Sequence, residues 1–210
     1  DVVIPETSCS YVEGCVAQPG LRRLLRFTST ILNQGHADMF VPDPKLNPQL
    51  FEFGECHQHY HFRNFAEYKL FAADGKTIVL EGQKKAYCME DTARHFDGVD
   101  VACDKVYDCS FQGIQKGWVD SYGWSLDCSW LDITDLEPGE YVLEITANPL
   151  RVIPEAYCDN NAAAVRVLIP TVSDTVWTAM RLQTEPLGDT EDAGSSVSWL
   201  STTFAASIAG

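Results

Sequence analysis

The chain has 210 residues, with thirty acidic and fifteen basic side chains, and its formal net charge at pH 7 is −15. This length suits a single domain with a sizeable core and a tail. The negative charge argues against a nucleic-acid backbone or an anionic membrane surface as a partner, whereas it would steer a cationic substrate toward the protein; the alternative is that the acidity serves only solubility.

The first predicted strand covers residues 21–32, where leucine is mixed with β-branched and aromatic residues. The sequence Asn33-Gln34-Gly35 that follows is typical of a turn. Residues 42–48 contain three prolines, so no regular structure is expected there.

Residues 56–61 read CHQHYH and hold three of the five histidines of the chain. In an extended segment, side chains alternate, so His57, His59 and His61 would point to one side. A straight strand would separate the first and third Cα atoms by about 13 Å, so the segment must curl or bulge if all three are to bind one ion. Imidazole suits zinc, copper, iron and nickel, and the alternative is a hydrated, half-exposed strand face.

The stretch after this motif, residues 61–72, is rich in Phe and Tyr and predicts a strand leaving the histidines. Residues 73–76 read ADGK and predict a hairpin turn into a further strand at residues 77–82. Residues 89–127 show weak periodicity and contain two cysteines, Cys103 and Cys109. We expect this stretch to be a long functional loop.

Two strands are predicted near the end of the domain. The turn at residues 138–139 leads into residues 140–149, and residues 162–170 predict the last strand. Alternation places two sets of side chains on one face of their strands: Tyr141, Leu143, Ile145 and Ala147 in the first, and Val165, Val167 and Ile169 in the second.

Many short strands, turns rich in Gly and Pro, and little helix predict a mainly β fold, with a β-sandwich core and long irregular loops. From Thr171 the chain becomes polar and acidic. We therefore expect a domain at residues 1–170 and a C-terminal extension of unknown role at residues 171–210.

Eight cysteines are scattered through the sequence without any C-x-x-C pair. An even number in this arrangement favours disulfides over a zinc ribbon, and disulfides favour an oxidising compartment. The sequence shows no leader pattern and no apolar run long enough for a membrane span, which predicts a mature secreted protein.

Several strings taken together resemble the catalytic domain of the lysyl oxidase family, in order and in approximate spacing. They are LLRF (24–27), NQG (33–35), ADMF (37–40), CHQHYH (56–61), EGQKKAYCMED (81–91), DSYG (120–123), DCSWLDIT (127–134) and PGEYVLEITANP (138–149). The resemblance covers residues 1 to about 170.

This resemblance implies a secreted copper amine oxidase that uses lysine tyrosylquinone, a quinone formed by crosslinking a lysine to a tyrosine oxidised next to the metal. The three histidines of CHQHYH match the copper motif of the family. The crosslinking lysine falls on Lys84, with Lys85 beside it, and the tyrosine falls on Tyr122. Copper can exchange electrons with a neighbouring phenol, which zinc cannot do.

A base that removes a proton from the substrate is also needed for this chemistry. Asp120 lies two residues before Tyr122 and would share a face with it in an extended stretch. Asp127 is the alternative carboxylate, and the sequence does not decide between the two.

The resemblance also implies disulfides. By position, the family pairs Cys9 with Cys15 and Cys56 with Cys103. Arg94 and Trp118 stand where the family usually has cysteines, and the remaining four cysteines allow three connectivities. The pairing that we prefer joins Cys88 to Cys109 and Cys128 to Cys158.

The string PEAYCDNN, residues 154–161, resembles a family segment that can bind calcium. Its candidate ligands are Glu155, Asn160 and Asn161, with Asp1 as a further oxygen donor, while Tyr157 stands where a carboxylate would be expected. Such oxygen donors suit a hard cation. An Asx turn before the last strand explains the same residues without an ion.

The predicted function is the oxidation of primary amines to aldehydes by dioxygen, with lysine ε-amines of proteins or peptides, or small amines, as substrates. Two alternatives remain open at this stage. One is a jelly-roll metalloprotein in which the histidines hold iron or zinc and no quinone forms. The other is a secreted binding module in which the metal is structural or absent.

Overall fold

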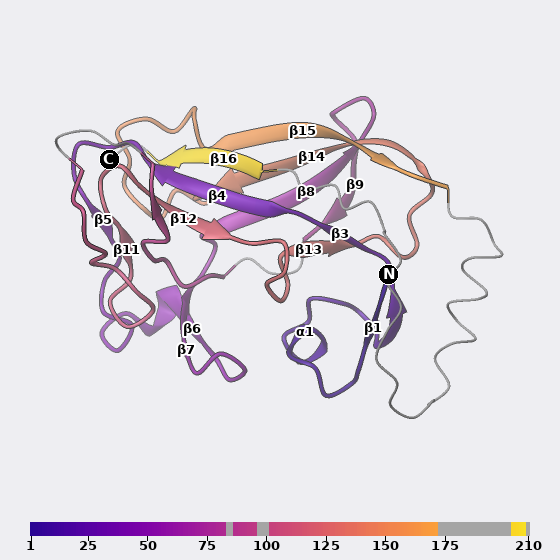
Figure 1. The fold of residues 1–210 in the computed structure, drawn as a ribbon, viewed down its shortest axis with the longest axis horizontal. Helices are drawn as coiled ribbons and strands as arrows, with labels where there is room; N and C mark the ends of the chain where they lie inside the picture. The colour runs from indigo at the N-terminus through magenta and orange to yellow at the C-terminus, as the bar shows by residue number, and fades with distance from the viewer. Residues whose placement is uncertain (83–85, 96–100, 172–202, 209–210) are drawn as a thin grey trace.

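The computed structural model describes residues 1–82, 86–95, 101–171 and 203–208. Two four-stranded sheets form its centre (Figure 1). The order of strands is β10-β12-β4-β16 in the first sheet and β15-β14-β8-β9 in the second. Two-stranded pairs surround them, namely β1-β2, β3-β13, β5-β11 and β6-β7. The predicted mainly β fold with little helix is confirmed.

The elements have the following bounds. The strands are β1 Val2–Ile4, β2 Gly20–Arg22, β3 Leu24–Arg26, β4 Thr28–Asn33, β5 Met39–Phe40, β6 Phe51–Gly54, β7 His59–Phe62, β8 Ala66–Ala72, β9 Ile78–Glu81, β10 Ala93–Arg94, β11 Gly113–Ile114, β12 Trp118–Tyr122, β13 Trp130–Asp132, β14 Gly139–Ala147, β15 Ala162–Ile169 and β16 Thr203–Ile208. The helical pieces are α1 Cys9–Val12 and the 3-10 turn η1 Pro48–Leu50.

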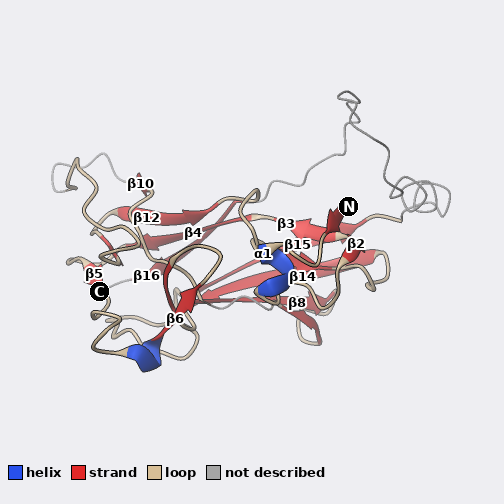
Figure 2. Ribbon diagram, turned by 90° about the horizontal axis from the view of Figure 1, so that it is seen from below, coloured by secondary structure: helices blue, strands red, loops and turns tan. Residues whose placement is uncertain are grey.

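The two sheets face each other across a common core (Figure 2). Ile31 of β4 is fully buried on one side, and Leu70 of β8 is fully buried on the other. Between the layers, the ring of Phe27 meets the ring of Tyr68 edge to face, with centroids 4.9 Å apart. The Tyr68 hydroxyl also hydrogen bonds to Ser29 Oγ at 3.0 Å. The sheets are therefore joined by packing and by a buried polar contact.

The strand predicted at residues 21–32 is divided into β2, β3 and β4. Each piece has a different partner: β2 pairs with β1, β3 with β13, and β4 with β12. The chain leaves strand geometry at Arg23 and Phe27 because it passes from one partner to the next. The predicted turn follows β4, where Asn33 Oδ1 accepts a hydrogen bond from the Gly35 N–H.

The hairpin predicted at residues 73–76 is confirmed between β8 and β9. Asp74 Oδ1 accepts hydrogen bonds from the N–H groups of Lys76 and Thr77, which closes the turn. The strands predicted at residues 140–149 and 162–170 correspond to β14 and β15, which pair antiparallel. The predicted shared faces are also confirmed, since Leu143, Ile145 and Ala147 of β14 and Val167 and Ile169 of β15 are buried, while Tyr141 and Val165 are half-buried.

The long loop predicted at residues 89–127 contains three strands. The most central is β12, which lies between β10 and β4. Trp118, Val119 and Asp120 are consecutive and all buried, so this strand shows no alternation in the sequence. Arg94 of β10 lies opposite Trp118 in register, so the two positions where family cysteines were expected are direct neighbours.

Three disulfides brace the fold: Cys9–Cys56, Cys15–Cys128 and Cys88–Cys109. The preferred pairing of Cys88 with Cys109 is confirmed. The other three predicted pairs, Cys9–Cys15, Cys56–Cys103 and Cys128–Cys158, are wrong. Cys103 and Cys158 are free cysteines.

The fold explains why those pairs do not form. Cys9 begins α1 and meets Cys56 at a Cα separation of 5.7 Å, while Cys15, beyond the helix, meets Cys128 at 5.4 Å. The short N-terminal helix thus ties two separate parts of the domain together instead of closing on itself. Cys103 is exposed, and Cys158 stays free because its predicted partner Cys128, just before β13, is bonded to Cys15.

The last described strand, β16, comes from the predicted C-terminal extension. It pairs parallel with β4, with Thr203 opposite Thr28 and Ile208 opposite Asn33. Part of the extension therefore adds an edge strand to the first sheet. In the part of the chain that the structure describes, no helix is both long and apolar enough to span a bilayer.

Candidate active site

The CHQHYH segment is bent by the hairpin of β6 and β7. Residues 55–58 form its turn, and Gln58 has a φ of +57°, in the left-handed region. His57 lies in this turn, whereas His59 and His61 lie on β7. The straight-strand separation that argued against a shared ion therefore does not apply, because the segment curls at its first histidine.

The backbone beneath the histidines allows close approach of the last ring. A Cβ added to Gly54 would lie 2.9 Å from Cε1 of His61. Glycine at this position lets the buried His61 imidazole lie against β6. The Nε2 atoms of His59 and His61 are 3.1 Å apart, so these two rings converge on one point.

The third ring has a different neighbour. The centroid of His57 lies 5.7 Å from that of His59 and 5.4 Å from that of His61. Its Nε2 atom faces Glu13, whose Oε1 is 3.2 Å away. Glu13 carried no signal in the sequence motifs, apart from its position between Cys9 and Cys15.

Tyr122 reaches the same region from β12. Its hydroxyl donates hydrogen bonds to the Cys88 carbonyl oxygen at 3.0 Å and to Asp120 Oδ2. Asp120 Oδ2 also accepts from the Glu90 N–H at 3.3 Å. Asp120 and Tyr122 therefore do share a face of the chain, because β12 is extended.

Burial controls the acidity of both groups. The pKa of the Asp120 carboxyl is raised well above its usual range because burial disfavours its charge. The pKa of the Tyr122 phenol is also raised, first by burial and then by the neighbouring Asp120. The ring of Tyr87 packs 4.5 Å from that of Tyr122, which adds to the apolar surroundings. Burial therefore keeps both groups protonated to higher pH than in water.

One small cavity of about 180 Å³ joins these residues. It is lined by His57, His59, His61, Tyr87, Cys88, Glu90, Cys109, Asp120, Ser121, Tyr122, Leu126, Asp127 and Ser129. The three histidines, the tyrosine and both candidate bases thus meet in one place.

Asp127 differs from Asp120 in its hydrogen-bond partner, since Asp127 Oδ1 accepts a hydrogen bond from Ser10 Oγ at 3.3 Å. Lys84 and Lys85 lie outside the described residues.

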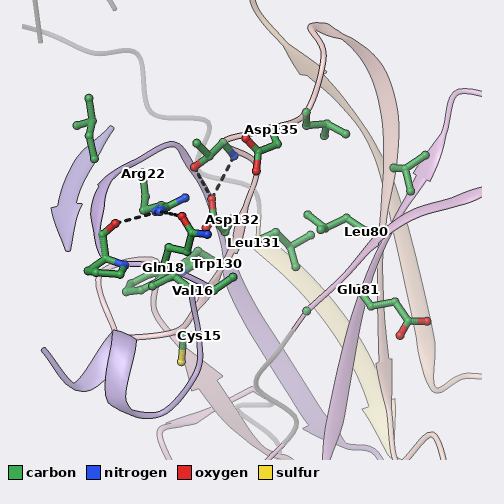
Figure 3. A pocket seen from close by; sticks show the side chains of 17 residues that line it. Cys15, Val16, Gln18, Arg22, Leu80, Glu81, Trp130, Leu131, Asp132 and Asp135 are labelled. Carbon is green, nitrogen blue, oxygen red and sulfur yellow. Dashed lines mark hydrogen bonds between the residues drawn. The ribbon is translucent and has the colours of Figure 1, made fainter. Parts of the chain in front are cut away.

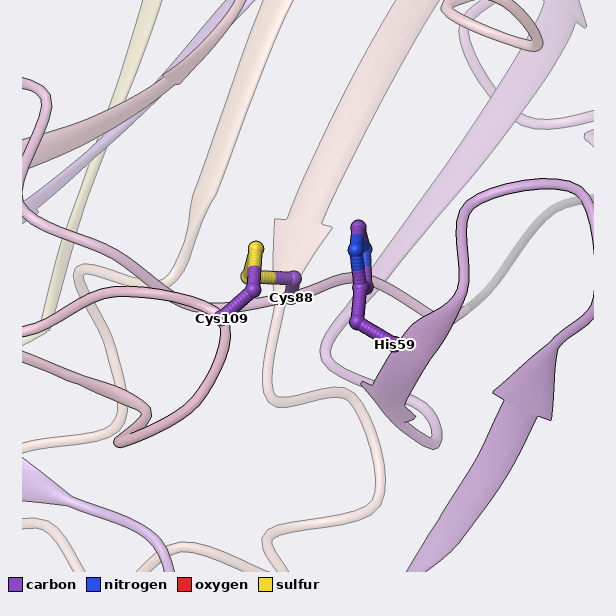
Figure 4. A group of neighbouring side chains, drawn as sticks. All are labelled: His59, Cys88 and Cys109. Atoms are coloured by element: carbon purple, nitrogen blue, oxygen red, sulfur yellow. A yellow bond between two sulfur atoms is a disulfide. The ribbon is translucent and has the colours of Figure 1, made fainter.

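A groove of about 640 Å³ borders this cavity and shares His59 and Cys109 with it. Its walls are largely apolar and include Phe53, Tyr60 and Phe111. Figure 4 shows His59 beside the Cys88–Cys109 disulfide, of which Cys109 lines both spaces. Because these sulfurs are bonded to each other, they do not act as thiolate ligands beside His59.

A larger cavity, of about 730 Å³, flanks the Cys15–Cys128 disulfide. Arg22, Trp130 and Asp132 line it (Figure 3), and Arg22 donates a hydrogen bond to the Pro19 carbonyl oxygen. No predicted metal, cofactor or base residue lies among its described lining residues. Size alone therefore does not mark the chemical site.

The predicted calcium ligands form a second cluster of polar side chains. Glu155 Oε1 accepts hydrogen bonds from the side-chain amides of Asn161, at 3.0 Å, and Asn148. Three further oxygens are buried without a hydrogen-bond partner among the described residues, namely Glu155 Oε2, Asn160 Oδ1 and Asn161 Oδ1. Buried oxygens of this kind match the donors that a hard cation takes.

Asp1 and Tyr157 are the other residues named with this cluster, and neither belongs to the hydrogen-bonded group described above. Asp1 precedes β1, and its amino group has a lowered pKa because of burial and the nearby charges of Arg26 and Arg23. Tyr157 is exposed. The oxygen cluster is therefore formed by the segment before β15.

Comparison with known proteins gives a consistent result. The lysyl oxidase family model matches residues 6–178. Protein-lysine 6-oxidase of Homo sapiens is 36% identical over 169 residues, which cover 73% of this chain and 38% of that protein. The Sus scrofa protein of the same name is 34% identical over 175 residues, covering 76% and 66%. Lysyl oxidase homolog 3A of Danio rerio is 40% identical over 166 residues, covering 73% and 21%.

The chain thus spans between 21% and 66% of the length of these relatives. The matched region includes the histidine hairpin, β12 and the oxygen cluster. Because the family match covers most of the sequence and contains every residue of the cavity, the chain belongs to the lysyl oxidase family.

Proposed function

We propose that this protein is a secreted, copper-dependent amine oxidase that converts lysine ε-amines of proteins or peptides to aldehydes. The observation that carries the proposal is that the three histidines, Tyr122 and Asp120 line one cavity. A redox metal beside a tyrosine is the arrangement that oxidation of the phenol ring would need. The relatives named protein-lysine 6-oxidase support the same substrate class.

The donor set fits copper. His59 and His61 bring two imidazole nitrogens to one point, and His57 lies at the same cavity. Nitrogen donors of this kind favour copper(II) over the other divalent ions of its series. Bound copper would supply the electron exchange with dioxygen that oxidation of Tyr122 requires.

The surroundings of Tyr122 fit a protein-derived quinone formed with Lys84. The ring of Tyr122 is held by two hydrogen bonds at its hydroxyl and by the ring of Tyr87. Such restraint keeps a ring in one orientation for modification. The quinone would supply a carbonyl group that condenses with a primary amine and takes up two electrons. In the net reaction, an amine, dioxygen and water give an aldehyde, ammonia and hydrogen peroxide.

Asp120 is the residue that we assign as the base. Its Oδ2 contacts the Tyr122 hydroxyl, and its Oδ1 is buried without a hydrogen-bond partner among the described residues. The raised pKa of this carboxyl makes it a stronger base than an exposed aspartate once it is ionised. Asp120 therefore accepts the proton that the substrate carbon loses.

The substrate class follows from charge and access. With a net charge of −15, the protein attracts cationic amines over a long range. The groove of about 640 Å³ that shares His59 with the cavity would take up the chain beside a target lysine. Three disulfides suit an oxidising, extracellular location.

We also propose that Glu155, Asn160 and Asn161 hold a calcium ion. Their three buried oxygens without hydrogen bonds would each destabilise the fold by about 1–3 kcal/mol. A cation bound by these oxygens would offset that cost, and its role would be structural.

The test of the amine oxidase proposal is Tyr122→Phe, assayed by amine-dependent release of hydrogen peroxide. The variant lacks the phenol oxygen from which the quinone forms, so turnover should be abolished while bound copper stays at the wild-type level. Tyr141→Phe is the matched control, because the Tyr141 hydroxyl donates a hydrogen bond to the Glu137 carbonyl oxygen, in the turn before β14. Full residual activity of Tyr122→Phe would refute the proposal. A copper-loaded wild type without any peroxide release would favour a metalloprotein that forms no quinone.

A further inference from the structure

Glu13 occupies a defined position beside the histidine hairpin. It is the residue directly after α1, and both of its carboxylate oxygens approach His57 Nε2, Oε1 at 3.2 Å and Oε2 at 3.3 Å. Its side chain is 18% exposed, and that of His57 is 29% exposed. The contact is therefore largely shielded from water.

Covalent bonds hold this contact on both sides. Cys9, four residues before Glu13, is bonded to Cys56, which directly precedes His57. Cys15, two residues after Glu13, is bonded to Cys128, next to the cavity residue Asp127. An exposed ion pair between flexible side chains contributes little, because holding it costs side-chain entropy. Here the backbones of both partners are already fixed.

The backbone of the same segment is also fixed by hydrogen bonds. The Glu13 N–H donates to the Cys9 carbonyl oxygen at 2.8 Å, and Ser10 Oγ donates to Asp127. The segment from Cys9 to Cys15 thus touches the hairpin at one end and the cavity wall at the other. The position of Glu13 is a consequence of this bracing.

A carboxylate at one imidazole nitrogen decides what the other nitrogen can do. A carboxylate oxygen accepts hydrogen bonds, so its partner Nε2 carries the proton in a neutral ring. The proton is then absent from Nδ1, which keeps a lone pair for a metal. Carboxylates that bind metal-ligating histidines in this way orient the ring and increase its basicity.

We propose that Glu13 is a positioning residue of the metal centre, which fixes His57 in the tautomer that offers Nδ1 to the metal. His59 and His61 differ from His57, since their Nε2 atoms face each other. The centre would thus combine one Nδ1 donor with two Nε2 donors. This inference rests on the proposed copper site and deepens it.

The first test uses the metal-free protein and nitrogen NMR of the imidazole rings. In the wild type, the signals of His57 should show the proton on Nε2. In Glu13→Leu, which removes the acceptor at similar size, they should show a mixture of tautomers, and Glu13→Gln, which keeps an acceptor oxygen, should restore the wild-type pattern in part. Glu55→Gln is the control, because Glu55 is exposed in the hairpin turn. A His57 tautomer that is the same in wild type and Glu13→Leu would overturn the inference.

The second test measures copper(II) affinity by competition with a chelator. Loss of a carboxylate that orients a metal ligand typically lowers affinity about 10- to 100-fold. We expect a loss in this range for Glu13→Leu, a smaller one for Glu13→Gln, and none for Glu55→Gln. An affinity of Glu13→Leu within threefold of the wild type would also overturn the inference. If the wild type itself binds no copper, the proposed function fails, whatever the tautomer of His57.

Discussion

The two candidate metal sites of this protein differ in donor chemistry and in what surrounds them. The histidine site has nitrogen donors on a bent hairpin and shares its cavity with Tyr122 and Asp120. The oxygen cluster has carboxylate and amide donors in the segment before β15. Nitrogen donors suit a redox metal, whereas oxygen donors suit a hard ion without redox chemistry.

Because of this difference, we expect the histidine site to affect catalysis and the oxygen cluster to affect stability. The groups around the histidines are titratable, aromatic and open to a groove, so loss of this site should change the chemistry. Three oxygens of the other cluster are buried without hydrogen bonds among the described residues, namely Glu155 Oε2, Asn160 Oδ1 and Asn161 Oδ1, so loss of their ion should change the free energy of unfolding. Variants at the two sites should therefore give opposite patterns.

The largest effect is expected for His61→Ala. His61 is buried, and its Nε2 lies 3.1 Å from that of His59, so the variant removes one of two converging donors. Copper affinity should fall by at least about 100-fold, and peroxide release should disappear. Isothermal titration with copper measures the first effect. Calcium should stabilise His61→Ala as much as it stabilises the wild type. If calcium no longer stabilised this variant, the two sites would not be independent.

The next largest effect concerns Asp120→Asn, measured as turnover per quinone that phenylhydrazine can label. Loss of a general base should lower kcat by about 10²- to 10⁴-fold. In the wild type, kcat should rise with pH through the raised pKa of Asp120, and this rise should be absent in the variant. Asp127→Asn tests the other carboxylate, and a larger loss there would transfer the role of base to Asp127.

The same raised pKa predicts how stability depends on pH. Asp120 binds its proton more tightly in the folded than in the unfolded chain, so its contribution is full at low pH. That contribution is lost as the pH rises from about 4 through the raised pKa. Urea unfolding of the wild type should show this loss relative to Asp120→Asn, and a difference that does not vary with pH would contradict the assignment.

A moderate effect is expected at the oxygen cluster. Calcium at 100 times its dissociation constant would stabilise the wild type by about 2.7 kcal/mol, a rise in Tm of about 5–10 °C. Glu155→Gln should lose most of this rise yet keep its copper affinity. Glu140→Gln, at an exposed position of β14, is the control. An equal response of Glu155→Gln and the wild type would place calcium elsewhere.

The smallest effect is expected for Gly54→Ala. The added Cβ would lie 2.9 Å from Cε1 of His61, so the ring must shift by a few tenths of an ångström. Copper affinity should fall a few-fold, since all three histidine ligands remain. Gly75→Ala, in the turn after β8, adds a Cβ that meets nothing within 4 Å; its φ of +65° strains that turn alone, so copper affinity should stay unchanged. A 100-fold loss for Gly54→Ala would mean that the hairpin itself is disrupted.

The sequence predicted those parts of the fold in which the local pattern of apolar residues matches the side of the strand that is buried in the structure. The hairpin at residues 73–76 and the inward faces of β14 and β15 are of this kind, because alternation reports burial on one side. Strand β12 was missed because both of its faces are buried. The division of residues 21–32 into three strands was missed because each piece pairs with a different strand, which lies elsewhere in the sequence.

The site shows the same contrast. The histidines and Tyr122 could be found because they lie in specific strings, although only the fold brings them to one cavity. Disulfide pairing depends on where α1 packs, so three of the four predicted pairs were wrong. Glu13 lies 44 residues from His57, and no periodicity connects the two.

The most direct test of the central claim is peptide mapping by mass spectrometry, after copper loading, aerobic incubation and treatment with phenylhydrazine. We expect one hydrazine-labelled species that joins the peptide of Lys84 to the peptide of Tyr122. In Lys84→Arg, this species should be absent, and a persistent label would move the link to Lys85. Separate, unmodified peptides from a protein with copper bound at its histidines would contradict the account, because the cavity would then hold a metal without the cofactor.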